Sequence, residues 1–149
     1  MSVSINTFAV ERAIGDTVEG VALVSMVPFS ARYDLDREEG LISRMGHPLK
    51  GQSVRDKILI CPAVQGGVAA GWAFLAMKGR GHGFKGLVFG RTNPVMVQGA
   101  QAADIPIAAG VDEAIFTHVT TGMVVRLDPA SREVVVIDSS ASSARDATA

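Results

Sequence analysis

The chain has 149 residues, of which 48% are hydrophobic and 19% charged, and its formal net charge is −1. This length predicts one well-cored domain, and the near-neutral charge without a basic stripe excludes nucleic acid as an expected partner. The single cysteine, Cys61, rules out an internal disulfide and cannot hold a metal or iron–sulfur cluster alone. We expect a cytoplasmic protein, because residues 1–16 carry no signal-peptide pattern and no apolar run reaches the ~18 residues of a membrane span.

The first third of the chain predicts strands separated by polar connections. Residues 2–8 are expected to form a short strand, and the apolar run over 20–27 predicts a buried one. Residues 29–40 are polar and turn-rich, and their clustered acidic side chains indicate a solvated loop. A proline and glycines within 41–53 indicate irregular backbone.

The middle of the chain predicts an alternation of strands and helices. A strand over 57–61 leads to an apolar helix over 68–77, which we expect to be buried between layers because it is hydrophobic nearly all round. A short strand over 86–90 comes next. The helix that follows runs to about residue 104, with Asn93 as its N-cap and a proline at its first position.

The last part of the chain returns to β structure. A short strand over 105–108 and a brief helix over 111–117 precede a hairpin whose arms are 123–127 and 133–137. Strands and helices that alternate in the middle, with β structure at both ends, predict an α/β domain. Its architecture would be a compact sheet or flattened barrel with helices packed outside.

The most informative motif is Gln65-Gly66-Gly67, which joins the apolar strand to the apolar helix that begins at Val68. Such a helix start leaves backbone N–H groups unpaired, and the positive end of the helix dipole adds to them. These four residues therefore predict a site for a carboxylate or phosphate. Glycines also make ordinary strand-to-helix turns, which is the alternative interpretation.

Other polar side chains are candidates for the same site, each with a structural alternative. His47 could act as an acid, a base or a hydrogen-bonding group, or be a loop histidine bonded to backbone. Gln52 and Ser53 could line the mouth of the site or cap turns. Gln65 could reach a ligand or cap its own turn, and Arg91, which follows a strand end, could pair with a substrate carboxylate or be solvated. The sequence indicates no metal site.

Several segments, taken in order and spacing, resemble the small, swivelling subunit or domain of the aconitase X family. The resemblance covers roughly residues 20–137. It rests on Glu19-Gly20 with Ala22 to Ser25, Asp36 to Gly40, His47-Pro48-Leu49 with Gly51-Gln52-Ser53, Lys57 to Ile60 with Pro62, Asn93-Pro94, Gly99-Ala100, Ala103, Ile105-Pro106 and Thr121-Gly122.

The resemblance implies a swivelling β/β/α fold, here a single domain over 1–138 with a disordered tail over 139–149. It also implies a larger partner subunit that carries the iron–sulfur cluster and most substrate contacts, so no cofactor is expected in this chain. The activities of the family are dehydrations of small hydroxylated acids, including cis-3-hydroxy-L-proline and mevalonate 5-phosphate. The small subunit would close over the substrate as a lid.

The sequence departs from the family pattern at the expected catalytic position. The serine that is the proton acceptor in the family falls on Gly67, a later serine of the same motif falls on Gly71, and Arg44 stands where an acid usually precedes the His-Pro-Leu segment. Another residue, with His47 as the candidate, could supply the base. Otherwise the protein catalyses a different reaction or none.

These departures keep two further functions open. The chain could be a non-catalytic, stand-alone swivel module that binds a small acidic ligand or a protein partner, and that forms a homo-oligomer when alone. It could also be a purely structural assembly subunit, in which case the glycine-rich helix start and the His47 loop would have no function.

Overall fold

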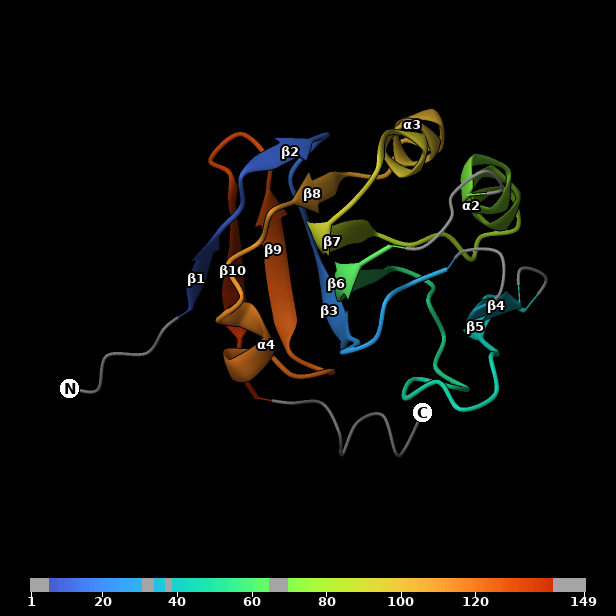
Figure 1. Ribbon diagram of the computed structural model, residues 1–149, viewed down its shortest axis with the longest axis horizontal. Coiled ribbons are helices and arrows are strands. Elements are labelled where there is room, and N and C mark those ends of the chain that lie inside the picture. Colours follow the sequence, from blue (N-terminus) through green and yellow to red (C-terminus); the bar gives the residue numbers. More distant parts are fainter. Residues whose placement is uncertain (1–5, 31–33, 37–38, 65–69, 141–149) are drawn as a thin grey trace.

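The structure is a computed structural model that describes residues 6–30, 34–36, 39–64 and 70–140, the last range with backbone alone for 70–73. Its described residues form a sheet of eight strands in the order β1-β10-β9-β3-β6-β7-β8-β2 (Figure 1). The strands are β1 (Thr7–Ala9), β2 (Arg12–Ile14), β3 (Val18–Val24), β6 (Lys57–Ala63), β7 (Gly86–Arg91), β8 (Ile107–Ala109), β9 (Val124–Asp128) and β10 (Glu133–Asp138).

Four parallel strands, β3, β6, β7 and β8, form the centre of the sheet. Consecutive side chains of β6 alternate between two cores, since Ile58 and Ile60 pack on one face while Leu59 and Cys61 pack on the other. A strand whose two faces are both covered has to be apolar throughout, which is why this stretch has no polar alternation. The predicted central strands are therefore confirmed.

The two ends of the sheet are joined by one stretch of chain. β1 pairs antiparallel with β10, and β2, which follows after only Val10 and Glu11, pairs antiparallel with β8 at the opposite end of the strand order. Between them, Val10 N–H donates to the carbonyl of Arg132 and Glu11 N–H to that of Ala109. The sheet thus curls into a flattened barrel, as expected, although β2 itself was not predicted.

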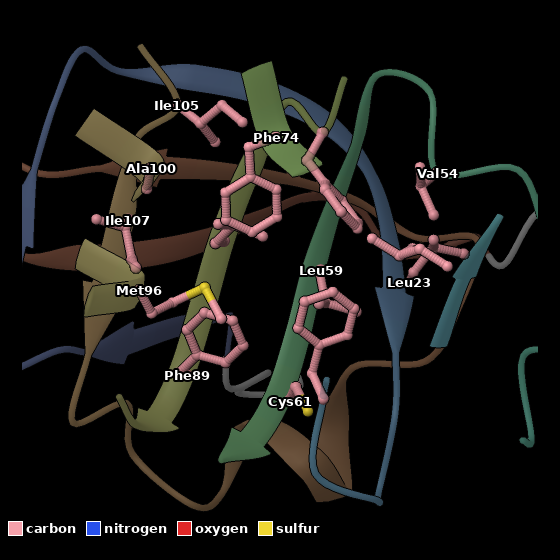
Figure 2. Close-up of a cluster of buried hydrophobic side chains, with 14 of the residues drawn as sticks. Leu23, Val54, Leu59, Cys61, Phe74, Phe89, Met96, Ala100, Ile105 and Ile107 are labelled. Atoms are coloured by element: carbon pink, nitrogen blue, oxygen red, sulfur yellow. The ribbon is translucent and has the colours of Figure 1, made fainter. Parts of the chain in front are cut away.

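The helices α2 (Ala70–Gly79) and α3 (Pro94–Ala102) lie together outside the sheet, and α4 (Ile115–His118) covers the barrel from another side (Figure 1). Phe74 of α2 and Met96 of α3 pack on Leu59 and Phe89 of the sheet (Figure 2). The expectation that the first long helix is buried all round is wrong for its described side chains, because Leu75 is 43% exposed.

The segment predicted as a solvated loop contains structure. β4 (Leu35–Asp36) pairs antiparallel with β5 (Leu41–Ile42) in a small second sheet, and Asp34 is fully buried. The prediction of a loop of solvated acids is therefore wrong for Asp34. We call residues 29–54, apart from the undescribed 31–33 and 37–38, the excursion, because they leave the main sheet after β3 and return before β6.

Two local predictions are confirmed. The Asn93 side chain accepts a hydrogen bond from Met96 N–H at 2.8 Å, which makes Asn93 the N-cap of α3 with Pro94 at its first position. The C-terminal hairpin forms with Val134 opposite Leu127. The start of the apolar helix and residues 141–149 lie outside the described residues.

Candidate functional site

The carboxyl ends of the central strands meet at one edge of the sheet, where ligands of open α/β sheets usually bind. β6 ends at Ala63, which is opposite Arg91 at the end of β7. The predicted anion site at Gln65, Gly66, Gly67 and Val68 follows β6 directly and lies outside the described residues, so it stays a prediction. The described residues around this edge define its surroundings.

At the carboxyl ends of β3 and β6, the side chains of Ser25 and Cys61 interact with backbone carbonyls. The Ser25 hydroxyl donates to the carbonyl of Val27 at 3.0 Å and accepts the Val27 N–H at 3.2 Å. The Cys61 thiol contacts the carbonyls of Val27 at 2.9 Å and Ala63 at 3.3 Å. Burial raises the pKa of Cys61 from 9.0 to about 11, so at neutral pH it is a protonated structural thiol and no nucleophile.

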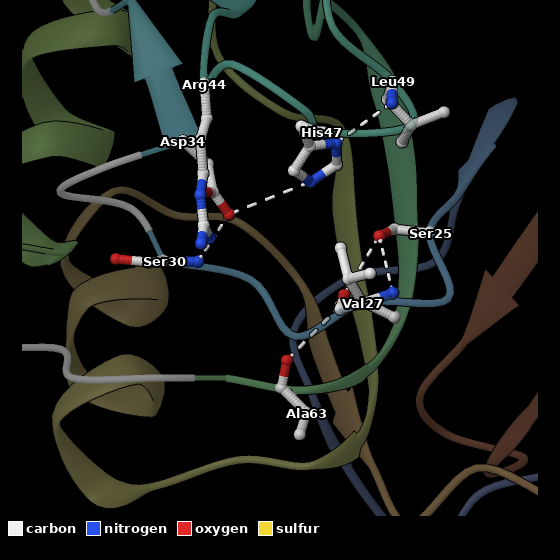
Figure 3. A network of polar contacts seen from close by, with 9 residues as sticks. Ser25, Val27, Ser30, Asp34, Arg44, His47, Leu49 and Ala63 are labelled. Atoms are coloured by element: carbon white, nitrogen blue, oxygen red, sulfur yellow. Dashed lines mark hydrogen bonds and ion pairs between the residues drawn. The ribbon is translucent and has the colours of Figure 1, made fainter.

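The excursion reaches the same edge and is organised by a buried carboxylate. Phe29 N–H donates to the carbonyl of Ala63, which places the next residues beside the end of β6. Ser30 N–H donates to Asp34 Oδ2 at 2.8 Å, and the Arg44 guanidinium donates to Asp34 Oδ1 at 3.2 Å (Figure 3). Arg44, which departs from the family pattern, thus neutralises a buried acid of its own segment.

His47 completes this cluster. Its Nδ1 accepts the Leu49 N–H at 3.0 Å, and its Nε2 lies 3.9 Å from Asp34 Oδ2, with only 2% of the side chain exposed. Burial lowers the pKa of His47 below 6.5; Asp34 raises it and Arg44 lowers it to a smaller extent. In the neutral ring Nδ1 is the acceptor, so Nε2 carries the proton and faces Asp34. Both ring nitrogens therefore face groups of this chain, and catalysis by His47 stays a prediction.

Gln52 and Ser53 follow the His47 turn, and the Gln52 N–H donates to the carbonyl of Leu49 at 2.9 Å. Ser53 bridges to Leu41, and its carbonyl accepts from the side chain of Lys57 at the start of β6. The carbonyl of Gln52 accepts the Ile42 N–H. These contacts place both residues toward the amino end of β6, whereas Arg91 marks the carboxyl end of β7. The structure does not bring Gln52 or Ser53 together with Arg91, and their part in binding stays a prediction.

Arg91 lies on a groove that sequence reasoning missed. The groove has a volume of about 560 Å³ and lies between β2, β8, the connection after β7 and the start of α3. Its polar lining includes Arg12, Arg91 and Thr92. Among its lining residues the sequence singles out Arg91 as a candidate for binding, while the rest of the groove carries no such signal because one of its walls is the unpredicted strand β2.

Metal binding and membrane crossing find no support in the described part of the chain. There, no group of three or more His, Cys, Asp or Glu side chains is arranged to hold a metal ion. None of the helices described is both long and apolar enough to span a membrane.

Comparison with known proteins identifies the family. The family model of the aconitase X swivel domain matches residues 7–137, which is most of the chain. The chain belongs to the aconitase X swivel-domain family. The resemblance expected from the sequence is thereby confirmed.

Relatives of this swivel domain include two archaeal proteins named phosphomevalonate dehydratase small subunit. The one from Thermococcus kodakarensis is 31% identical over 127 residues, covering 85% of this chain and 93% of the relative. The one from Pyrococcus abyssi is 33% identical over 120 residues, covering 80% and 90%. The swivel domain thus corresponds to nearly the full length of these relatives.

Solved structures agree with the assignment. The crystal structure of Thermococcus kodakaraensis aconitase X in its holo-form matches with a TM-score of 0.81 at 30% identity, over 89% of the swivel domain and 98% of that chain. The solution NMR structure of a UPF0107 protein matches equally well, with a TM-score of 0.81 at 30% identity. The expected swivelling α/β fold is therefore confirmed.

Proposed function

We propose that this chain is the small, lid-forming subunit of an aconitase X-type hydro-lyase, which dehydrates a small hydroxy acid together with a large subunit. The observation that carries the proposal is the match over nearly the whole length of proteins named phosphomevalonate dehydratase small subunit. The words "small subunit" in the names of these relatives support a large-subunit partner. The cytoplasm is the compartment that we propose for the complex.

The division of chemistry between the subunits is the one that the family resemblance implies, and this chain's composition agrees with it. Iron–sulfur clusters are held by several thiolates, and this chain has one cysteine, whose thiol is buried and protonated. These residues do not fit a cluster, so we assign the cluster to the large subunit and derive no step through it. What this chain contributes is substrate binding, closure and the exclusion of water.

Substrate binding is assigned to the carboxyl edge of β6 and β7. The N–H groups of residues 65–68 would hold one acidic group, as the sequence predicts, and Arg91 would hold it or a second one from the neighbouring strand. Ala63 and Arg91 are partners in the sheet register, so the two donors start from adjacent strands. Donors of this kind also stabilise negative charge that develops when a proton leaves carbon.

Proton removal needs a base that Gly67 cannot supply. His47 is the candidate on this chain, because its lowered pKa keeps the ring unprotonated and able to accept a proton at neutral pH. To act, its ring would have to release the Leu49 N–H from Nδ1, the nitrogen that carries the lone pair, when the large subunit docks. If it does not, the base comes from the large subunit.

Co-expression with the large subunit tests the proposal. We expect a stable complex that dehydrates mevalonate 5-phosphate or cis-3-hydroxy-L-proline. Arg91→Gln should reduce kcat/KM at least about tenfold, as expected for one lost charged contact, whereas Arg55→Gln, an exposed arginine toward the amino end of β6, should not. Absence of a complex would remove the main support.

The alternative is a non-catalytic swivel module that binds a small acidic ligand or a protein partner. The glycine at position 67, where the family has its proton acceptor, favours it. In this version the isolated chain binds small hydroxy acids in calorimetric titrations or self-associates into a homo-oligomer. Detection of turnover in the two-subunit complex would exclude it.

A further inference from the structure

The groove beside Arg91 has the size and composition of a small-molecule site. Its volume of about 560 Å³ is within the range of roughly 300–1,000 Å³ typical of ligand pockets. Apolar side chains from three elements line it, and its polar groups come from β2 and the residue before it, from the end of β7 and from the connection to α3. The apolar members include Ala13, Ile14, Pro94, Val97 and Ile107.

The charged groups of the groove are free to take a ligand. Within the described part of the chain, neither Arg12 nor Arg91 pairs with a carboxylate or forms a side-chain hydrogen bond, and both residues are exposed. The acidic lining residue, Glu11, packs its side chain over Gly110, where an added Cβ would lie 2.7 Å from it. The charged lining therefore carries an excess of one positive charge.

A polar atom in the groove wall also lacks a partner. The Thr92 hydroxyl oxygen is buried and makes no hydrogen bond in the described structure, a condition that costs stability. Thr92 directly follows Arg91 and precedes the N-cap of α3. Because Thr92 also lines the groove, we infer that its hydroxyl is available to a ligand held by Arg91.

We propose that this groove binds the apolar carbon skeleton of a small organic acid, with the acid group, carboxylate or phosphate, held between Arg91 and Arg12. The identification of that acid as the enzyme's substrate rests on the proposed function. The inference deepens that function, because it places the non-reacting end of the substrate in the groove. A purely polar acid would leave the apolar walls unused, and a neutral apolar molecule would leave both arginines unpaired.

Titration of the isolated full-length chain tests this, with amide chemical shifts as the readout. Hexanoate, acetate and hexanol serve as probes. Hexanoate has both a carboxylate and an apolar chain, acetate has the carboxylate without the chain, and hexanol has the chain without the carboxylate. We expect hexanoate to bind at least about tenfold more tightly than either, with shifts centred on Thr92, Val97 and Gly110. Arg91→Gln and Thr92→Val should weaken hexanoate about tenfold and a few-fold respectively, while Arg55→Gln should leave it unchanged.

Equal binding of the three probes, shifts outside the groove, or an unchanged affinity of Arg91→Gln would overturn the inference. So would hydrogen-exchange protection of the groove by the large subunit alone, since a protein segment would then be its occupant. If the complex is active but the groove binds no acid, the groove is not a ligand site and the proposed function is unaffected. If no complex forms but hexanoate still binds, the proposed function is wrong and the assignment of the groove as a ligand site is unaffected.

Discussion

Asp34 and His47 face each other inside the excursion, with Asp34 Oδ2 and His47 Nε2 3.9 Å apart and 0% and 2% of the two side chains exposed. One precedes β4 and the other follows β5, so the pair ties both ends of the small sheet together. Asp34 also accepts the Ser30 N–H, and the chain reaches Ser30 directly from its bridge to Val64. The cluster thereby fixes the chain beside the carboxyl end of β6.

Removing the carboxylate should destabilise the fold. In Asp34→Ala the buried Ser30 N–H loses its acceptor and Arg44 its partner, for which we expect a loss of about 2–3 kcal/mol in the free energy of unfolding. Urea unfolding followed by circular dichroism measures it. Arg44→Gln is the control and should cost at most about 1 kcal/mol, because the Arg44 side chain is 51% exposed. Equal costs for both variants would contradict a central role of Asp34.

Stability should decline on mild acidification because of His47. Its pKa is lowered in the fold, so the unfolded chain binds the proton more readily, and stability is lost as the pH falls below the ordinary value of 6.5 toward the lowered one. His47→Asn can retain an acceptor for the Leu49 N–H without a titrating ring. The free energy of unfolding, measured between pH 7.5 and 5, should therefore depend less steeply on pH in His47→Asn than in the unsubstituted chain. An unchanged slope would exclude His47 as the source of the pH dependence.

The Cys61 thiol should resist alkylation in the native protein. Burial raises its pKa to about 11, so the reactive thiolate is scarce at pH 8, and the side chain is inaccessible. Iodoacetamide labelling followed by mass spectrometry should be slow without denaturant and complete in urea. Rapid labelling of the folded chain would show that the edge between β3 and β6 opens readily.

Because β6 and β7 approach each other closely at Gly90, any side chain at this position should destabilise the fold. A Cβ at this position would lie 2.5 Å from the carbonyl oxygen of Pro62, so Gly90→Ala should cost about 1–3 kcal/mol and displace Arg91. Gly79 in α2 has nothing within 4 Å of an added Cβ, and Gly79→Ala should stabilise the helix by up to about 1 kcal/mol. Thermal unfolding of the two variants should therefore shift in opposite directions.

The elements predicted well from sequence are those governed by local chemistry. The cap at Asn93 depends on residues within one turn, and the apolar runs of β3, β6 and β7 carry their burial in their composition. The C-terminal hairpin is likewise local. The resemblance to the aconitase X family added the swivelling fold, which the comparisons confirm.

The features missed depend on contacts between distant residues. Nothing in the sequence distinguishes Asp34 from the acidic residues that follow it, and its burial is stabilised only because the chain brings Arg44 and His47 back to it. β2 has three residues and no alternation, and it becomes a strand because β8 offers an edge. The groove needs β2, β8 and α3 at once, so it could not be anticipated from any one stretch of the sequence.

The joining of both sheet ends by β1 and β2 has a consequence for biosynthesis. Thr7 pairs with Val135, so β1 is synthesised long before the strand that it pairs with and can join the sheet only after β10 has been made. Such distant pairing makes folding slow and leaves an open strand edge meanwhile. Pulse-labelled hydrogen exchange should find β1 among the last segments protected, and a nascent chain stalled before residue 133 should stay incompletely closed.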